Sequence, residues 1–346
     1  MKYTTLSTTD LRVSKICLGT MSYGAQVSEQ DAFEQMDMAI DMGVNFFDTA
    51  EMYAIPPSAT NYGKTETIIG KWLDNTGNRD KIVLATKVMG PNRYPFVRDG
   101  SCRLDKKNIE AAINESLKRL KADSIDLYQL HWPDRHINWF GQRGYIHNPN
   151  EQVTPIEETL NALKDIQKSG KVRYFGLSNE TPWGTMQFLQ IAKEHGYPRM
   201  VSIQNVYNLL NRHYEINMTE ISHRENIGLL SYSPLGFGVL GGRYFDGQRP
   251  QGGRFTLYPK FADRYHQTHV TEIAKEYQKL AKNHNLTLPQ LSLAFVNRQP
   301  FITSNIIGAS NIEQLREDIE TIHIELSNEV LKEIDKIHER YPNPCS

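Results

Sequence analysis

Two apolar runs, Ile82-Val-Leu-Ala-Thr-Lys87 and Ser124-Ile-Asp-Leu-Tyr-Gln-Leu-His131, lie on either side of a stretch with a helical repeat. In that stretch, apolar residues recur at the spacing that places side chains on one face of an α-helix. These residues are Ile109, Ile113, Leu117 and Leu120. The pattern predicts a strand, a helix and a second strand, which is the repeating unit of a parallel sheet.

The same alternation of short strands and amphipathic stretches continues along the chain. Strands are predicted over residues 16–20, 45–49, 82–87, 124–131, 172–178, 201–205, 228–233 and 302–308. Eight such units within one chain are typical of a closed (β/α)8 barrel rather than of an open doubly wound sheet. We therefore expect an α/β fold with one barrel domain that spans residues 1–346.

Three helices of this pattern carry start signals. Thr154, Thr181 and Asn311 stand where N-caps are expected. Pro155 and Pro182 follow the first two caps at the first helical position, where the missing N–H of proline removes no hydrogen bond.

The composition excludes several classes of protein. The 346 residues include 39 Lys+Arg and 40 Asp+Glu, for a formal net charge of −1, so no basic excess exists to bind nucleic acid. No apolar run reaches the ~18 residues that a membrane helix needs, and the N-terminus has no apolar signal core. The odd number of cysteines (Cys17, Cys102 and Cys345), without Cys-x-x-Cys spacing, predicts a reducing, cytoplasmic environment.

Three segments interrupt the rhythm, and each follows a predicted strand. Residues 54–63 carry Pro56-Pro57, residues 132–153 are rich in aromatic residues, histidine and glycine, and residues 234–267 contain seven glycines. Loops that follow the strands of a barrel form its C-terminal face, where active sites are built. We expect the functional site on that face.

Four polar residues are expected at the same end of the barrel. Asp48 and Lys87 end or nearly end the second and third predicted strands, His131 ends the fourth, and Tyr53 lies in the loop after the second. Taken singly, each is more often structural, as a cap, a core ring, a solvated lysine or an imidazole bonded to the backbone. Because parallel strand ends meet at one face, the four together indicate a site.

This set has the composition of a proton donor for a carbonyl group. A phenol has an ordinary pKa of ~10, which is too high for an efficient acid near neutral pH, and a nearby ammonium lowers it. We expect Lys87 to lower the pKa of Tyr53 and Asp48 to keep Lys87 charged. His131 would then orient the substrate oxygen, and Tyr53 would act as the general acid.

Four motifs resemble those of the aldo-keto reductase superfamily, and the resemblance covers essentially the whole chain. The motifs are Gly43-Val-Asn-Phe-Phe-Asp-Thr-Ala-Glu-Met-Tyr53, Leu127-Tyr-Gln-Leu-His-Trp-Pro133, Gly170-Lys-Val-Arg-Tyr-Phe-Gly-Leu-Ser-Asn179 and Ile307-Gly-Ala-Ser-Asn-Ile-Glu-Gln-Leu315. They look most like the branch that holds potassium-channel β-subunits and bacterial general-stress reductases. The resemblance implies NADPH-dependent reduction of aldehydes or ketones to alcohols, with the four residues above in the roles just given.

The resemblance also implies where the cofactor is held. Ser178, Asn179 and Gln204 would hold the carboxamide, and Tyr232 would stack on the nicotinamide ring. Further expected contacts are Gly19, Thr20, Met21 and Asp48, then Ser233, Pro234, Leu235, Gly236, Phe237, Gly238 and Arg243 over the pyrophosphate, and Gly308, Ser310, Gln314, Glu317 and Asp318 near the 2′-phosphate. Tyr23, Trp132 and Trp139 are the expected walls of the substrate pocket.

The 2′-phosphate region departs from the pattern of many family members, which carry a basic residue where Gln314 stands and asparagine where Asp318 stands. A helix N-terminus still favours an anion there, whereas the carboxylate of Asp318 opposes a nearby phosphate. We expect NADPH as the cofactor.

The residues Gly236-Phe-Gly-Val-Leu-Gly241 contain the spacing G-x-G-x-x-G, which in other folds marks a dinucleotide site at a strand-to-helix turn. Here the motif comes late in the chain, and a turn-rich stretch follows it where a helix is required. We interpret it instead as a loop whose N–H groups approach a pyrophosphate, because barrels often bind phosphates after strands seven and eight.

Two other classes of protein are alternatives to a reductase. A cofactor-sensing regulatory subunit with incidental turnover would share the fold, but a pure scaffold would not need all four catalytic positions filled. A metal-dependent barrel hydrolase would need ligands on several strand ends. The only clustered candidates are His131, Asp134, His136 and His147, so we expect no resident metal.

Overall fold

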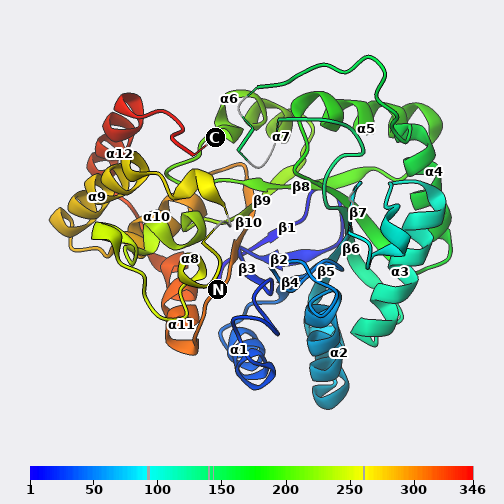
Figure 1. Ribbon diagram of the computed structural model, residues 1–346, viewed down its shortest axis with the longest axis horizontal. Helices are drawn as coiled ribbons and strands as arrows, with labels where there is room; N and C mark the ends of the chain where they lie inside the picture. Colours follow the sequence, from blue (N-terminus) through cyan, green and yellow to red (C-terminus); the bar gives the residue numbers. More distant parts are fainter. Residues whose placement is uncertain (92–93, 139–140, 143, 260–261, 346) are drawn as a thin grey trace.

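The computed structural model describes residues 1–91, 94–138, 141–142, 144–259 and 262–345. Eight parallel strands close into a barrel in the order β10-β3-β4-β5-β6-β7-β8-β9, with helices around it (Figure 1). The strands are β3 (Ile16–Gly19), β4 (Phe46–Asp48), β5 (Val83–Val88), β6 (Ile125–Leu130), β7 (Val172–Ser178), β8 (Met200–Val206), β9 (Gly228–Tyr232) and β10 (Ile302–Ile307). The predicted (β/α)8 barrel is confirmed, and each strand lies within two residues of its expected bounds.

Helices cover the outside of the barrel and the region beyond its strand ends. The α-helices are α1 (Glu29–Asp41), α2 (Lys64–Thr76), α3 (Lys106–Leu120), α4 (Ile156–Lys168), α5 (Pro182–His195), α6 (Tyr214–Asn217), α7 (Thr219–Arg224), α8 (Arg254–Leu257), α9 (Thr268–Asn283), α10 (Leu288–Asn297), α11 (Ile312–Glu320) and α12 (Asn328–Arg340). Short 3-10 helices are η1 (Asn78–Lys81), η2 (Arg98–Gly100), η3 (Gly236–Gly241), η4 (Phe245–Gly247), η5 (Asp263–Tyr265) and η6 (Thr321–His323). None of the helices among the described residues combines the length and apolarity needed to cross a bilayer.

Two of the three predicted caps are confirmed. The side chains of Thr181 and Asn311 accept hydrogen bonds from the backbone N–H groups of Gly184 and Gln314 at the starts of α5 and α11. The cap predicted at Thr154 is wrong, because its hydroxyl donates to Asp134 instead, at 2.6 Å. Helix α4 begins at Ile156, so Pro155 occupies the cap position and not the first helical one.

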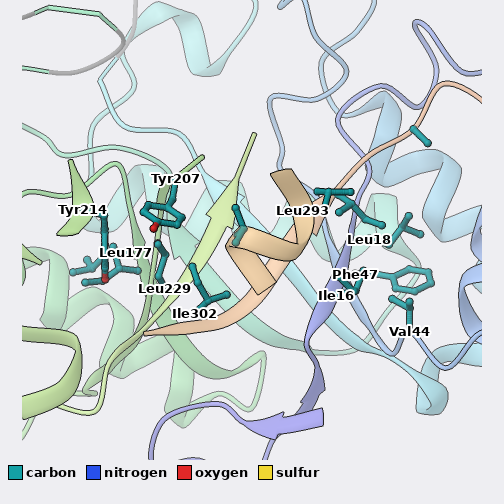
Figure 2. Packing of buried hydrophobic residues seen from close by; sticks show 14 of the residues in the cluster. Ile16, Leu18, Val44, Phe47, Leu177, Tyr207, Tyr214, Leu229, Leu293 and Ile302 are labelled. Atoms are coloured by element: carbon teal, nitrogen blue, oxygen red, sulfur yellow. The ribbon is translucent and has the colours of Figure 1, made fainter. Parts of the chain in front are cut away.

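Successive strand residues alternate between two apolar layers. Ile16 and Leu18 of β3 belong to the large layer between strands and helices, whereas Cys17 belongs to a cluster inside the barrel. Figure 2 shows part of the outer layer, in which Leu18 and Phe47 lie on one side of Leu293 of α10 and Leu229 and Ile302 on the other. Both faces of each strand are therefore buried, as expected for a parallel sheet.

A β-hairpin that the sequence patterns did not reveal closes the N-terminal end of the barrel. Strands β1 (Tyr3–Thr5) and β2 (Arg12–Ser14) pair antiparallel and run across the barrel (Figure 1). Leu6, Leu11 and Val13 from this hairpin join the cluster inside the barrel. With this end filled by apolar side chains, a functional site has room only at the opposite end.

Candidate active site

A cleft of about 1500 Å³ opens at the C-terminal ends of the barrel strands. All three segments that interrupt the strand and helix rhythm contribute to its walls, for example through Ile55, Trp132 and Phe237. Its volume exceeds the ~300 to 1,000 Å³ of a typical small-molecule site. The cleft can therefore hold a dinucleotide together with a small substrate.

Lys87 lies under the floor of this cleft, fully buried at the end of β5. Its Nζ donates to Oδ2 of Asp48 at 2.6 Å and to the carbonyl oxygen of Thr49 at 2.8 Å. The hydroxyl oxygen of Tyr53 is 3.4 Å from the same nitrogen. The structure thus brings together the ammonium, the carboxylate and the phenol that the sequence placed at one end of the barrel.

Two glutamine side chains complete the surroundings of Asp48. Its Oδ1 accepts hydrogen bonds from Nε2 of Gln129 at 2.9 Å and from Nε2 of Gln204 at 2.8 Å. With Lys87 on the other oxygen, both carboxylate oxygens are bonded, which a buried charge requires. Gln129 was missed in the sequence, although a single glutamine inside the apolar β6 was a usable signal.

The protonation of this cluster is set by burial as well as by charge. Burial raises the pKa of Tyr53 above its ordinary value, and the ammonium of Lys87 only partly opposes that rise. Burial lowers the pKa of Lys87, but the carboxylate of Asp48 more than compensates, so the net pKa is raised and Lys87 stays charged. The expected net lowering of the Tyr53 pKa is therefore wrong for this structure, because desolvation outweighs the lysine.

His131 stands beside the phenol, with its ring edge-on to that of Tyr53 and the ring centroids 5.7 Å apart. Burial, with a further contribution from Lys87, lowers the pKa of His131 well below its ordinary value, so the imidazole is neutral. Its buried Nδ1 has no hydrogen-bond partner among the residues that the structure describes. A neutral imidazole next to a phenol can contact a substrate oxygen without adding charge.

Glu51 fixes the turn that carries Tyr53, and sequence reasoning missed it. Its fully buried carboxylate accepts hydrogen bonds from Nη1 and Nη2 of Arg98, at 2.6 and 2.9 Å. It also accepts hydrogen bonds from the hydroxyl of Tyr62 at 2.8 Å and from the backbone N–H of Met89 at 2.7 Å. These bonds tie the loop after β4 to the end of β5, which holds the phenol near Lys87.

Most of the expected cofactor contacts line the cleft. They are Gly19, Thr20, Met21, Asp48, Ser178, Asn179, Gln204, Tyr232, Ser233, Pro234, Leu235, Phe237, Gly238, Arg243, Gly308, Ser310, Gln314, Glu317 and Asp318. Gly236 is the exception, because it is buried behind the loop, where a side chain would come within 3.1 Å of the ring of Tyr265.

The expected nicotinamide end contains a network of oriented amides. Nδ2 of Asn179 donates a hydrogen bond to the carbonyl oxygen of His131 at 2.9 Å. Its Oδ1 accepts one from the hydroxyl of Tyr232 at 2.7 Å. Nε2 of Gln204 donates a hydrogen bond to Asp48, while its Oε1 accepts no hydrogen bond from the described part of the chain. An amide oxygen at the cleft and a tyrosine ring fixed by its hydroxyl fit a neutral carboxamide and a flat ring.

The glycine-rich stretch after β9 forms the 3-10 segment η3 rather than the turn of an open-sheet dinucleotide site. Positive φ angles of 55°, 55° and 103° at Gly236, Phe237 and Gly238 curl the backbone beside the cleft. The N–H groups of Gly236 and Gly238 donate to the carbonyl oxygens of Ser233 and Leu235, both at 2.9 Å, so the loop holds its own shape at the edge of the cleft.

Gln26 and Arg254 form a bridge that the sequence analysis missed. Nε2 of Gln26 donates to the carbonyl oxygen of Gly252 at 2.8 Å, and Nε of Arg254 donates to Oε1 of Gln26 at 3.3 Å. Both side chains line the cleft. Burial lowers the pKa of Arg254, and no carboxylate among the described residues pairs with it, so this guanidinium suits an anionic group in the cleft.

The expected substrate walls are met only in part. Trp132 lines the cleft, with its ring centroid 4.8 Å from that of His131. Tyr23 does not line it: the ring is 1% exposed in the core, and its hydroxyl donates to Gln35 at 3.2 Å. The turn after β3 points this side chain away from the cleft. Trp139 lies outside the described residues.

The residues considered for a metal site have other roles. Asp134 accepts hydrogen bonds from the side chain of Arg103 and the N–H of Leu104. His136 and His147 contact Gln142 and Tyr145. Within the described ranges, no three or more His, Cys, Asp or Glu side chains are grouped as metal ligands are.

Comparison with known proteins defines the class to which this fold and site belong. The sequence model described as the Aldo/keto reductase family matches residues 15–339. The chain therefore belongs to the aldo/keto reductase family, a class of oxidoreductases, and the resemblance inferred from the motifs is confirmed.

Individual relatives agree with this assignment. The chain is 44% identical to Protein tas of Escherichia coli (strain K12), with 100% of both chains covered. It is 35% identical to Uncharacterized oxidoreductase YrpG of Bacillus subtilis (strain 168), over 99% of this chain and 97% of that protein. It is 36% identical to Aldo-keto reductase of Babesia bovis, over 76% of this chain and 98% of that protein.

Proposed function

We propose that this protein reduces the carbonyl group of aldehydes or ketones to an alcohol with NADPH as the hydride donor. The observation that carries the proposal is the buried contact of Lys87 with Asp48 and Tyr53, beside a neutral His131. This arrangement faces a cleft large enough for a dinucleotide. Membership of an oxidoreductase family supports the same reaction class.

The cofactor would supply the hydride, and the chain's own residues would manage the proton. The hydroxyl of Tyr53 would donate its proton to the carbonyl oxygen as that oxygen gains negative charge. The ammonium of Lys87, 3.4 Å away, would stabilise the phenolate that remains. A neutral His131 would hold the substrate oxygen by a hydrogen bond, which directs it towards Tyr53.

The remaining lining residues would orient the cofactor. The Oε1 of Gln204, which accepts no hydrogen bond from the described residues, and the fixed ring of Tyr232 suit the carboxamide and the nicotinamide ring. Arg254 suits the pyrophosphate, because its guanidinium offers N–H donors to an anion. Ser310 and Gln314 at the start of α11 would then lie near the 2′-phosphate.

We predict that each chain binds one NADPH without a metal. Tryptophan fluorescence should be quenched to saturation as NADPH is added, and EDTA should leave the titration curve unchanged. The same purified protein should oxidise NADPH when an aldehyde is added, measured as loss of absorbance of the reduced cofactor. Absence of binding, or binding abolished by EDTA, would contradict the proposal, and binding without turnover of any aldehyde, ketone or quinone would favour a cofactor-sensing subunit.

We also predict that Gln314→Arg shifts cofactor preference towards NADPH. A guanidinium at this position would pair with the 2′-phosphate, and a gain of about tenfold in the Kd ratio corresponds to ~1.4 kcal/mol. The ratio of the Kd values for NADPH and NADH is the measurement. Gln190→Arg, at an exposed position on α5, adds the same charge away from the cleft and should leave the ratio unchanged. An unchanged ratio in Gln314→Arg would show that residue 314 does not face the phosphate.

A further inference from the structure

Arg264 is a cationic side chain of the cleft wall to which the proposed function gives no role. It belongs to η5, in the long segment after β9, and is half-buried. Its Nε is buried and has no hydrogen-bond partner among the residues that the structure describes. No acid in the described ranges forms an ion pair with it, although the exposed Asp263 precedes it in the chain. A half-buried cation without a counter-charge suits an anionic ligand.

The neighbours of Arg264 hold it in place. Tyr265, the next residue, is 1% exposed and accepts a hydrogen bond from Nδ2 of Asn208 at 3.1 Å. Its ring makes a T-shaped contact with that of Phe237, with the centroids 5.4 Å apart. The guanidinium carbon of Arg264 lies over the Tyr265 ring, 5.3 Å from its centroid, where a cation is attracted. A side chain that is already ordered loses less conformational freedom when it binds a ligand.

The contacts of Tyr232 place Arg264 near the catalytic residues. Burial raises the pKa of Tyr232, the guanidinium of Arg264 opposes that rise, and the phenol of Tyr53 adds to it. Tyr232 therefore lies within electrostatic reach of both side chains. Its hydroxyl donates to Oδ1 of Asn179, whose Nδ2 donates to the carbonyl oxygen of His131. The cation is thus linked by a short series of contacts to the strand end that carries His131.

The loop after β6 also approaches Arg264. Its Cδ and Cβ lie 3.6 and 3.7 Å from the place where a Cβ on Gly141 would stand. Gly141 and Trp132 belong to this loop and both line the cleft. The Trp132 ring lies against His131, with the centroids 4.8 Å apart. A substrate in this part of the cleft therefore meets an aromatic surface beside His131 and a cation beside Gly141.

From these contacts, and on the basis of the proposed function, we propose that the carbonyl substrates of this protein carry a carboxylate group, which Arg264 binds while the carbonyl oxygen lies at Tyr53 and His131. The planar guanidinium matches the geometry of a carboxylate. One guanidinium balances one negative charge, so a carboxylate fits better than a phosphate group, which carries nearly two. The carboxylate is unchanged in the reaction: NADPH becomes NADP+, the carbonyl carbon gains the hydride, and its oxygen gains the proton.

The test compares acids with neutral amides of the same shape. The probes are 3- and 4-formylbenzoate, each paired with the corresponding formylbenzamide, so that the carboxylate stands at two distances from the aldehyde. For the unaltered protein, we expect kcat/KM to be higher for the acid by about tenfold or more in at least one pair, the usual size for a hydrogen bond to a charged group. Arg264→Gln should lower kcat/KM for that acid to the value for its amide. The amide kinetics and the Kd for NADPH should stay the same.

A matched control is Arg249→Gln, which removes a guanidinium from an exposed position in the same segment outside the cleft. It should keep the preference for the acid. If Arg264→Gln does not fold, Arg264→Lys replaces it and should keep only part of the preference, because the charge remains and the planar fork is lost.

Three results would overturn the inference and leave the proposed function standing. The first is equal kcat/KM for acid and amide in both pairs with the unaltered protein. The second is a full preference for the acid in Arg264→Gln, or in Arg264→Lys where that variant replaces it. The third is weaker NADPH binding in Arg264→Gln together with an equal loss for acid and amide, which would assign Arg264 to the cofactor. If neither these aldehydes nor any other carbonyl compound is reduced, the proposed function itself fails.

Discussion

Replacing Tyr53 with phenylalanine is expected to lower kcat for aldehyde reduction by ~10² to 10⁴, the usual contribution of a general acid. The variant keeps the ring that packs edge-on to His131 and loses only the hydroxyl 3.4 Å from Lys87. In the proposed mechanism the phenol acts on the substrate oxygen and not on the cofactor, so the Kd for NADPH should stay nearly the same. Steady-state kinetics with a reactive aldehyde and a fluorescence titration with NADPH provide the two measurements.

A matched control for this variant is Tyr197→Phe. Tyr197 follows the end of α5 and is not among the residues that line the cleft. The same loss of a hydroxyl there should leave kcat unchanged. If Tyr53→Phe kept the original kcat with every good aldehyde substrate, the assignment of the proton donor would be wrong, and with it the placement of the active site.

The barrel could be predicted from sequence because each of its units carries a local signal. A buried run such as residues 82–87 and a helix with one apolar face are recognisable without knowing what packs against them. The N-terminal hairpin was missed because its two short strands, Tyr-Thr-Thr in β1 and Arg-Val-Ser in β2, are mostly polar, whereas β4 has the same length but begins with two buried phenylalanines. Its register depends on the barrel interior that it fills, which is a tertiary property.

The residues proposed as catalytic could be grouped from the sequence because they lie at or just after strand ends, which a barrel brings to one face. The residues that orient them were harder to find, since Gln129 and Glu51 act on partners 81 and 47 positions away in the chain. The direction of the pKa shift of Tyr53 was also wrong in the sequence analysis. A nearby lysine can be inferred from a motif, but the desolvation that outweighs it depends on how completely the surrounding loops cover the ring.

Lys87→Met is expected to lower kcat by a factor comparable to that of Tyr53→Phe, without removing any group that touches the substrate. The ammonium opposes the rise in the pKa of Tyr53 caused by burial, so its loss makes the phenol a still weaker acid. The variant also leaves Asp48 buried with only its two glutamine donors. Breaking a buried ion pair in this way costs ~3 to 5 kcal/mol of folding free energy, so a lower Tm should accompany the lost activity.

A companion variant separates these two effects. Asp48→Asn together with Lys87→Met removes both charges, so part of the lost stability should return, because a neutral replacement of a buried ion pair is often tolerated. Activity should not return, since the phenol still lacks its cation. Thermal unfolding and kcat, measured on the same preparations, test this. Recovery of activity along with stability would show that Lys87 has only a structural role.

The double variant Tyr53→Phe with Lys87→Met tests whether the two residues act as a unit. If Lys87 works through the phenol, removing the lysine when the hydroxyl is already absent should cost little more, so the kcat of the double variant should match that of the poorer single variant. Independent contributions would instead multiply. Because the Lys87 variants are less stable, the comparison is made below the lowest Tm of the set. A multiplied loss would place Lys87 outside the proton-transfer step and leave Tyr53 to act without it.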